Sequence, residues 1–293
     1  MGRVTVLEVI QKSTEFLTRK GVESARLQVE LLLAHVLELP RLKLYLEFER
    51  VLSPEELDRL REGVQKRGQR VPLQHLLGTV SFCGYEMEVD SRVLIPRSET
   101  EQLAERAWLA LTQAREGAGA GGESVVLDFG TGSGCLAILM ALKCPWVRVH
   151  ALDVSSAALE VARANARRHR VEDRIEFHLS AGLAGLPGDA RYQLILSNPP
   201  YIPTAEMASL QPEVRDHDPR LALDGGADGL DFYRLLAREC GFFLDENGRL
   251  MAEMGDGQER GVRDVFEEAG WTVEKVLPDL ADRPRILVAC RSV

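Results

Sequence analysis

The sequence contains 293 residues, of which 45% are hydrophobic, and its formal net charge is −9. No apolar run approaches the length of a membrane-spanning helix, so we expect no membrane partner. The first 80 residues carry 13 basic and 11 acidic side chains, whereas the rest of the chain is strongly acidic. An acidic surface repels the phosphate backbone of duplex nucleic acid, so we expect no direct nucleic-acid partner.

Five cysteines are scattered along the chain without a C-x-x-C pair, at positions 83, 135, 144, 240 and 290. This pattern predicts free thiols in a reducing compartment and argues against disulfides or zinc. The six histidines show no metal-ligand spacing, and we predict no bound metal. The first residues lack the apolar core and cleavage site of a signal peptide. Together these features predict a cytoplasmic protein.

Residues 1–75 have helical periodicity. Apolar side chains recur at helical spacing over residues 4–20 and 24–39. A third helix is predicted after Ser53, because Pro54 suits the first helical position and Glu56 completes a capping box. We predict a small helical bundle that recognises a substrate; a purely stabilising role is the alternative.

Residues 76–95 predict a β-hairpin that links two domains. The stretch "LGTVSFCGYEMEVD" alternates in polarity, with Gly84 at its centre. A capping box from Ser98 to Glu101 then predicts the start of a helix. Residues 116–122, "EGAGAGG", predict a flexible connector.

Residues 96–293 predict an α/β domain. From Ser124 onward, apolar strand-like runs alternate with helical segments, which is the pattern of a parallel sheet covered by helices on both faces. The pattern contains about seven strands. The last two, "WTVEKV" and "RILVA", are expected to form an antiparallel edge.

A glycine-rich loop, "DFGTGSG", follows the first strand of this sheet. Gly130, Gly132 and Gly134 allow backbone N–H groups and a helix N-terminus to approach a ligand closely. By spacing alone, the loop also fits a dinucleotide-binding fingerprint. Asp128 would repel a pyrophosphate, but it suits the ammonium group of S-adenosylmethionine. Asp153 ends the second strand, where an acid accepts hydrogen bonds from ribose hydroxyls; capping the next helix is its alternative role.

A second motif, "SNPPY", ends the strand that begins at Tyr192. In a parallel sheet, ligands bind outside the carboxyl ends of the strands. The glycine loop, Asp153 and residues 197–201 all lie at such ends. We therefore expect them to face one crevice.

The chemistry of this motif suits a planar nitrogen that accepts a methyl group. Asn198 offers a side-chain carbonyl, and Pro199 offers a backbone carbonyl whose direction is restricted by Pro200. Tyr201 offers a flat ring on which a planar group can stack. Adenine, cytosine and the glutamine side chain all fit this description, and the motif alone does not distinguish them.

The motifs "DFGTGSG", "SNPPY", "LIPRSETE" and "ALDGGADGLDFYRLL", in a chain with a helical N-terminal region, resemble the HemK/PrmC family. The resemblance implies a class I, Rossmann-like, seven-stranded methyltransferase fold that uses S-adenosylmethionine. The expected substrate is the glutamine, methylated at N5, in the Gly-Gly-Gln loop of class I peptide-chain release factors, which the helical domain would help to dock. The family's site residues fall on Gly130, Thr131, Gly132, Ser133 and Gly134 (cofactor loop), Asp153 (ribose), and Asn198, Pro199, Pro200 and Tyr201 (amide clamp). Asn198 is also expected to contact the cofactor.

Two positions depart from the family pattern. An Asp-aromatic pair that contacts adenine is replaced here by Ala181 and Gly182, so we expect Gly182 to bind the cofactor through backbone groups, or Leu183 to contact it. Ser98 stands where release-factor enzymes carry proline. A related branch that methylates a ribosomal protein also has this serine but lacks the following "ETE". The resemblance therefore favours a release factor as substrate, with a ribosomal protein as the alternative.

Three other classes of protein share parts of the pattern. A DNA adenine or cytosine methyltransferase needs a basic recognition domain, which the charge distribution disfavours. A dinucleotide-dependent oxidoreductase leaves Asp128 and the double proline unexplained, and a non-catalytic sensor of the methyl donor does not need the amide clamp. Residues 202–228 have little periodicity, and we expect them to form part of the substrate groove.

Overall fold

A computed structural model describes residues 3–118 and 124–292. The chain divides into two compact units. The helical unit comprises residues 1–79 and 211–217, and the sheet unit comprises residues 80–210 and 218–293. Residues 119–122 of the predicted connector lie outside the described residues.

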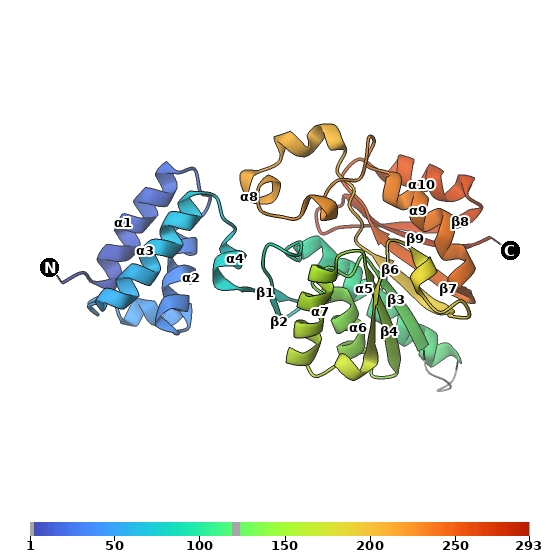
Figure 1. Cartoon of the computed structure of the whole chain (residues 1–293), viewed down its shortest axis with the longest axis horizontal. Helices are drawn as coiled ribbons and strands as arrows, with labels where there is room; N and C mark the ends of the chain where they lie inside the picture. Colours follow the sequence, from blue (N-terminus) through green and yellow to red (C-terminus); the bar gives the residue numbers. More distant parts are fainter. Residues whose placement is uncertain (1–2, 119–123, 293) are drawn as a thin grey trace. The chain divides into compact units, whose positions relative to one another are not determined.

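The helical unit contains α1 (Val6–Arg19), α2 (Ala25–Leu37), α3 (Pro54–Gly68) and the short α4 (Leu73–Leu77), with a 3₁₀ turn at residues 41–46 (Figure 1). Ser53 and Glu56 form the predicted capping box at the start of α3. Thr5 and Glu8 form another at the start of α1. Apolar faces of α1, α2 and α3 pack into one core, which confirms the predicted helical region.

A short segment from much later in the chain belongs to the helical unit. It contains α8 (Pro212–Arg215), a single helical turn. The Glu213 carboxylate accepts hydrogen bonds from Arg67 Nη2 at 2.6 Å and from Arg70 Nη2 at 2.7 Å. These charge-assisted bonds hold the segment against the end of α3.

The hairpin predicted around Gly84 is present. Strands β1 (Thr79–Phe82) and β2 (Tyr85–Glu88) form a two-stranded sheet. Both residues of the turn, Cys83 and Gly84, have positive φ, which is typical of the tight turns that join paired strands.

The capping box predicted between Ser98 and Glu101 is wrong. Ser98 is already part of α5 (Ser98–Ala118), and its hydroxyl donates to the Glu99 carboxylate. Glu101 instead accepts a hydrogen bond from the backbone N–H of Cys83 in the hairpin turn. A tertiary contact has replaced the local one that the spacing suggested.

The sheet unit is built on a seven-stranded sheet with the order β5-β4-β3-β6-β7-β9-β8. Neighbouring strands from β5 to β7 run parallel, whereas β9 is antiparallel to both β7 and β8. This confirms the predicted α/β fold with its antiparallel edge. The strands are β3 (Ser124–Phe129), β4 (Val147–Asp153), β5 (Ile175–Leu179), β6 (Tyr192–Ser197), β7 (Leu244–Glu253), β8 (Trp271–Pro278) and β9 (Pro284–Arg291).

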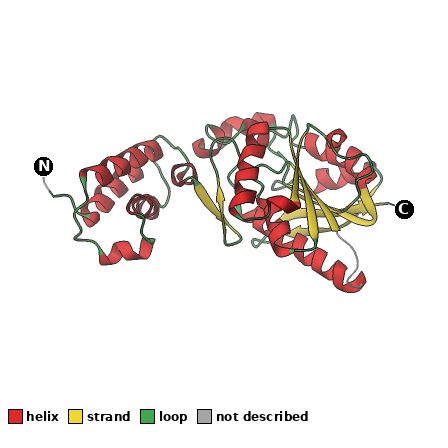
Figure 2. Cartoon of the chain, turned by 60° about the horizontal axis from the view of Figure 1, so that its bottom comes forward, coloured by secondary structure: helices red, strands yellow, loops and turns green. Residues whose placement is uncertain are grey.

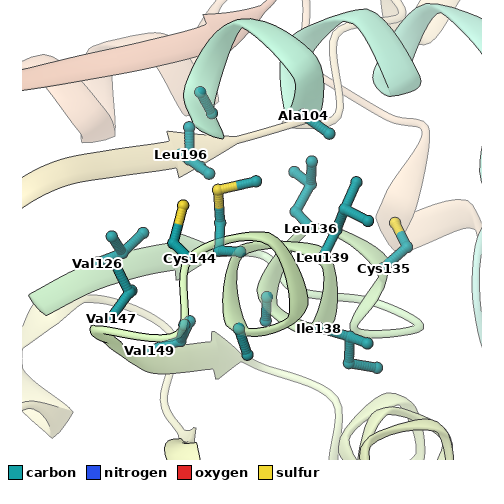
Figure 3. Close-up of a cluster of buried hydrophobic side chains, with 14 of the residues drawn as sticks. Ala104, Val126, Cys135, Leu136, Ile138, Leu139, Cys144, Val147, Val149 and Leu196 are labelled. Carbon is teal, nitrogen blue, oxygen red and sulfur yellow. The ribbon is translucent and has the colours of Figure 1, made fainter. Parts of the chain in front are cut away.

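Helices cover both faces of this sheet (Figure 2). On one face, α5, α6 (Cys135–Lys143) and α7 (Ser156–Arg168) contribute to a buried core, and α6 is apolar all round because it lies between the sheet and its neighbours (Figure 3). On the other face, α9 (Asp231–Glu239) and α10 (Glu259–Glu268) pack over a second core. Among the described helices, none is long and apolar enough to cross a bilayer.

Candidate active site

A cavity of about 380 Å³ lies in the sheet unit where β3, β4 and β6 end. Its volume falls within the range of small-molecule sites, roughly 300–1,000 Å³. The cavity brings together the glycine loop, Asp153 and Asn198, as expected from the meeting of parallel strand ends. Its apolar walls include Val93, Leu94, Phe129, Leu136, Leu221 and Phe232.

The glycine loop has a backbone path that only glycine follows without strain. Gly130, Gly132 and Gly134 all have positive φ, with values of 76°, 53° and 82°. A Cβ atom on Gly134 would lie 3.0 Å from the Cβ of Ala162, so the loop also packs tightly against α7. Thr131 and Ser133 lie between these glycines, and both line the cavity. The loop is thus a preformed cradle at the start of α6.

Asp153 joins the loop to the end of β4. Its Oδ2 accepts from the Gly132 N–H at 2.9 Å, and its Oδ1 accepts from the Ser155 N–H at 2.9 Å. The cap of α7 is Ser155, whose hydroxyl accepts from the Ala158 N–H. Asp153 is therefore not needed as the helix cap, and each carboxylate oxygen can accept a further hydrogen bond from a ligand in the cavity.

Asp128 lies behind the loop. Among the described residues, Asp128 is not one of those that line the cavity. Its Oδ2 accepts from Thr131 Oγ1 at 2.6 Å and from the Ala137 N–H at 3.0 Å, while Oδ1 is buried without a hydrogen-bond partner in the described chain. Burial raises the pKa of this carboxyl to about 7. Asp128 therefore fixes the loop to α6 and retains one unsatisfied oxygen that a nearby cation would stabilise.

The turn after β5 supplies part of the cavity rim. Ser180 and Ala181 line the cavity, whereas Gly182 does not belong to the described lining. The Gly182 carbonyl accepts from the Ser180 hydroxyl, and the neighbouring Leu183 N–H donates to Glu239. The structure thus places Ala181, and not the predicted Gly182, at the cavity.

The Asn198 side chain is held by a chain of hydrogen bonds. Its Nδ2 donates to Thr100 Oγ1 at 2.9 Å, and Thr100 donates to Glu253 Oε2 at 2.8 Å. Thr100 and Glu253 are 2% and 1% exposed, so water does not compete for these bonds. Because the amide nitrogen is engaged by Thr100, the orientation of the whole carboxamide is fixed.

Only part of the rest of the "SNPPY" motif lies at the cavity. Pro200 lines the cavity, but Pro199 and Tyr201 are not among the described lining residues. The Tyr201 backbone carbonyl accepts from Gln258 Nε2 at 2.8 Å, and its ring packs at the edge of the core under α9 and α10. Burial raises the pKa of the Tyr201 phenol to about 12. The motif is held in place by these contacts. The contacts of the Pro199 carbonyl and the Tyr201 ring with a substrate stay predictions.

The sequence analysis missed Thr100, Glu253 and Asn165. Asn165 on α7 is fully buried; its Nδ2 donates to the carbonyls of Ser133 and Glu88, which ties the glycine loop to the hairpin. The sequence did contain a signal for two of these residues. Asn165 lies on an apolar helix face and Glu253 ends a buried strand, and buried polar groups need hydrogen-bond partners.

An ion pair between the partly exposed Arg97 and a buried Asp218 supports another wall of the cavity. Asp218 accepts a hydrogen bond from Arg97 Nη2 at 2.5 Å, and the Asp218 side chain is fully buried. Burial raises the pKa of Asp218 to about 6. The next residues, Pro219, Leu221 and Ala222, line the cavity. This segment lies within the predicted substrate loop at 202–228.

These residues fit S-adenosylmethionine. The glycine loop lets its own backbone N–H groups approach the ligand closely. Asp153 offers acceptors for the ribose hydroxyls, and the Asp128 oxygen that has no hydrogen-bond partner in the described chain favours a positive charge nearby. The apolar walls suit a flat ring such as adenine.

Comparisons with known proteins agree with this arrangement. Family models match at residues 8–78 (PrmC N-terminal domain) and 111–213 (methyltransferase small domain). A release factor glutamine methyltransferase from Geobacter sulfurreducens is 43% identical over 267 residues, covering 91% of this chain and 90% of that protein. One from Chlorobaculum tepidum is 44% identical and covers 85% of each.

At the level of fold, the chain is similar to the catalytic domain of hMettl16, solved in complex with a 3′UTR hairpin. The TM-score is 0.51 at 14% sequence identity, and the similarity covers 81% of this chain and 82% of that one.

Substituting Gly134 by alanine tests the loop cradle. We expect Gly134→Ala to abolish the increase in melting temperature that S-adenosylmethionine causes, because positive φ and the contact with Ala162 force the loop to shift. The matched control is Gly188→Ala, at an exposed glycine whose Cβ would meet no atom within 4 Å. An unchanged ligand-induced shift in Gly134→Ala would contradict the assignment.

The buried Glu253 predicts a pH dependence of stability. Burial raises the pKa of its carboxyl from the usual 4.5 to about 7. Between these values the folded protein holds a proton that the unfolded chain releases. The free energy of unfolding should therefore fall as pH rises through this window, by at most about 1.4 kcal/mol per pH unit.

Urea unfolding between pH 5 and 8 measures this effect. Glu253→Gln should show a shallower decrease than the wild type, and the exposed control Glu246→Gln on the same strand should keep the wild-type slope. Equal slopes for Glu253→Gln and wild type would show that Glu253 keeps an ordinary pKa.

Proposed function

Because the chain belongs to the family of release factor glutamine methyltransferases, we propose that it methylates the glutamine side chain in the Gly-Gly-Gln motif of class I release factors. The methyl donor is S-adenosylmethionine and the accepting atom is the side-chain amide nitrogen, N5. The observation that carries the proposal is the fixed carboxamide of Asn198 beside a cradle suited to the donor.

An amide nitrogen is a weak nucleophile because its lone pair is delocalised into its carbonyl group. Catalysis therefore depends on positioning and electrostatics. Thr100 occupies the amide nitrogen of Asn198, which leaves Asn198 Oδ1 to accept from one N–H of the substrate glutamine. The Pro199 carbonyl accepts from the second N–H, and the Tyr201 ring covers the amide plane.

The donor, when bound, supplies a methyl carbon whose bond to the sulfonium sulfur breaks as the new bond to nitrogen forms. The nitrogen contributes the electron pair for that bond and afterwards loses one proton to water. No general base is required, because the nitrogen becomes acidic only once it is methylated. The role of residues 198–201 is to hold the acceptor in line.

The glycine loop, Asp153 and Asp128 hold the donor in this proposal. Asp153 accepts from the ribose hydroxyls, and the charge of Asp128 favours the ammonium group from behind the loop. Gly182 lies next to Ala181, which lines the cavity, and a contact of the Gly182 backbone with the cofactor stays a prediction.

The helical unit acts as the docking module for the release factor. Its match to the PrmC N-terminal domain supports this role. Release factors act on ribosomes, so the enzyme works in the cytoplasm. A glutamine of a ribosomal protein is the second candidate substrate, which the resemblance leaves open through Ser98. The curated relatives at about 40% identity favour the release factor.

Transfer of labelled methyl groups tests the substrate. We expect label on a class I release factor and none on a variant whose Gly-Gly-Gln glutamine is changed to alanine. Ribosomal protein is added in a parallel reaction. Equal labelling of the wild-type release factor and of its glutamine variant, or labelling of the ribosomal protein alone, would refute the proposed substrate.

Substitution of Asn198 tests the clamp. Asn198→Ala should lower kcat by roughly 100-fold or more, the effect of removing one positioned hydrogen-bonding group, while the donor's dissociation constant stays within a few fold. The exposed Asn247→Ala is the matched control and should keep full activity. If donor binding disappears in Asn198→Ala, the residue holds the cofactor and the clamp assignment is wrong.

A further inference from the structure

Three potential metal ligands lie together on two strands outside the candidate active site. His150 belongs to β4, and Glu176 and His178 belong to β5, the edge strand of the sheet. The register places Glu176 opposite His150, with His178 two residues further on the same face. Ligand atoms of all three lie within 4.8 Å of one another.

Both histidines approach the Glu176 carboxylate at distances that ligands of one metal ion have. Glu176 Oε2 lies 3.6 Å from His150 Nε2, and Glu176 Oε1 lies 3.4 Å from His178 Nε2. Zinc binds imidazole nitrogen and carboxylate oxygen at about 2.0–2.2 Å, so two adjacent tetrahedral ligands are about 3.3–3.6 Å apart. Each histidine nitrogen thus lies about as far from one Glu176 oxygen as two ligands of a zinc ion lie from each other, and ligand atoms of all three residues lie within 4.8 Å.

The contacts of the two histidines suit metal ligands. His150 Nδ1 lies 2.9 Å from the hydroxyl of the buried Tyr192, a contact of the kind that orients a ligand histidine from behind. His178 Nε2 is buried without a hydrogen-bond partner in the described chain, which is costly unless a ligand takes it.

We propose that His150, Glu176 and His178 bind one zinc ion. Two imidazoles and one carboxylate select zinc over magnesium or calcium, which prefer all-oxygen sites. The Glu176 side chain is 63% exposed, so the ion enters from solvent and a water molecule takes the fourth position. The ion cross-links the edge strand β5 to β4, just before Ser180 and Ala181 at the cavity rim.

Cobalt titration tests the site. Protein without a histidine tag is freed of metals by chelation and titrated with Co²⁺, whose visible spectrum reports tetrahedral coordination. We expect one Co²⁺ per chain, displacement by Zn²⁺ and none by Mg²⁺. Zn²⁺ should also raise the melting temperature.

Variants identify the ligands. His178→Ala and Glu176→Gln should each weaken Co²⁺ binding at least tenfold, and the exposed His35→Ala should leave it unchanged. Glu176→Gln changes a solvent-exposed side chain, so it decides the matter if His178→Ala does not fold. Absence of saturable Co²⁺ binding, or wild-type affinity in Glu176→Gln and in folded His178→Ala, would overturn the proposal.

Discussion

The buried chain of hydrogen bonds from Glu253 through Thr100 to Asn198 determines what the active site can do. It links three elements that are distant in sequence: the end of β7, the first turn of α5 and the loop after β6. A carboxamide that rotates freely presents either its N–H groups or its oxygen. With its nitrogen engaged by Thr100, Asn198 presents an acceptor, which is what a substrate amide nitrogen requires.

The cost of this arrangement is a buried acid. Glu253 is almost fully buried, and burial raises its pKa to about 7. A second acid, Asp128, lies in a similar position behind the glycine loop. Neither carboxylate belongs to the described lining of the cavity. Asp128 is hydrogen-bonded to the glycine loop, and Glu253 is linked through Thr100 to Asn198. Buried acids of this kind lower the stability of the fold at neutral pH. Residues that lower stability in this way are typical of functional sites.

Much of the site could be predicted from the sequence because strand ends converge. The glycine loop, Asp153 and Asn198 follow three parallel strands, and the rule for ligand crevices in such sheets places them together. The positive φ of Gly130, Gly132 and Gly134 agrees with the predicted role of these glycines in letting the backbone approach a ligand closely. These predictions needed only the order of strands and helices.

What the sequence did not reveal depends on register and on tertiary contacts. Thr100 reaches Asn198 only because α5 packs against β6 and β7, and the cluster around Glu176 exists only in the register of β4 with β5. The capping box at Ser98 failed because Glu101 found a partner in the hairpin turn. Gly182 lies outside the described cavity lining, next to Ala181, because the path of the turn after β5 depends on contacts such as that between Leu183 and Glu239.

A double-mutant cycle on Thr100 and Asn198 tests the central claim most directly, with kcat for methyl transfer as the readout. If Thr100 acts only by orienting Asn198, Thr100→Val should lower kcat in the wild type and have no further effect in Asn198→Ala. An equal loss of kcat in both backgrounds would show that Thr100 acts independently, and would contradict the role assigned to the hydrogen-bond chain.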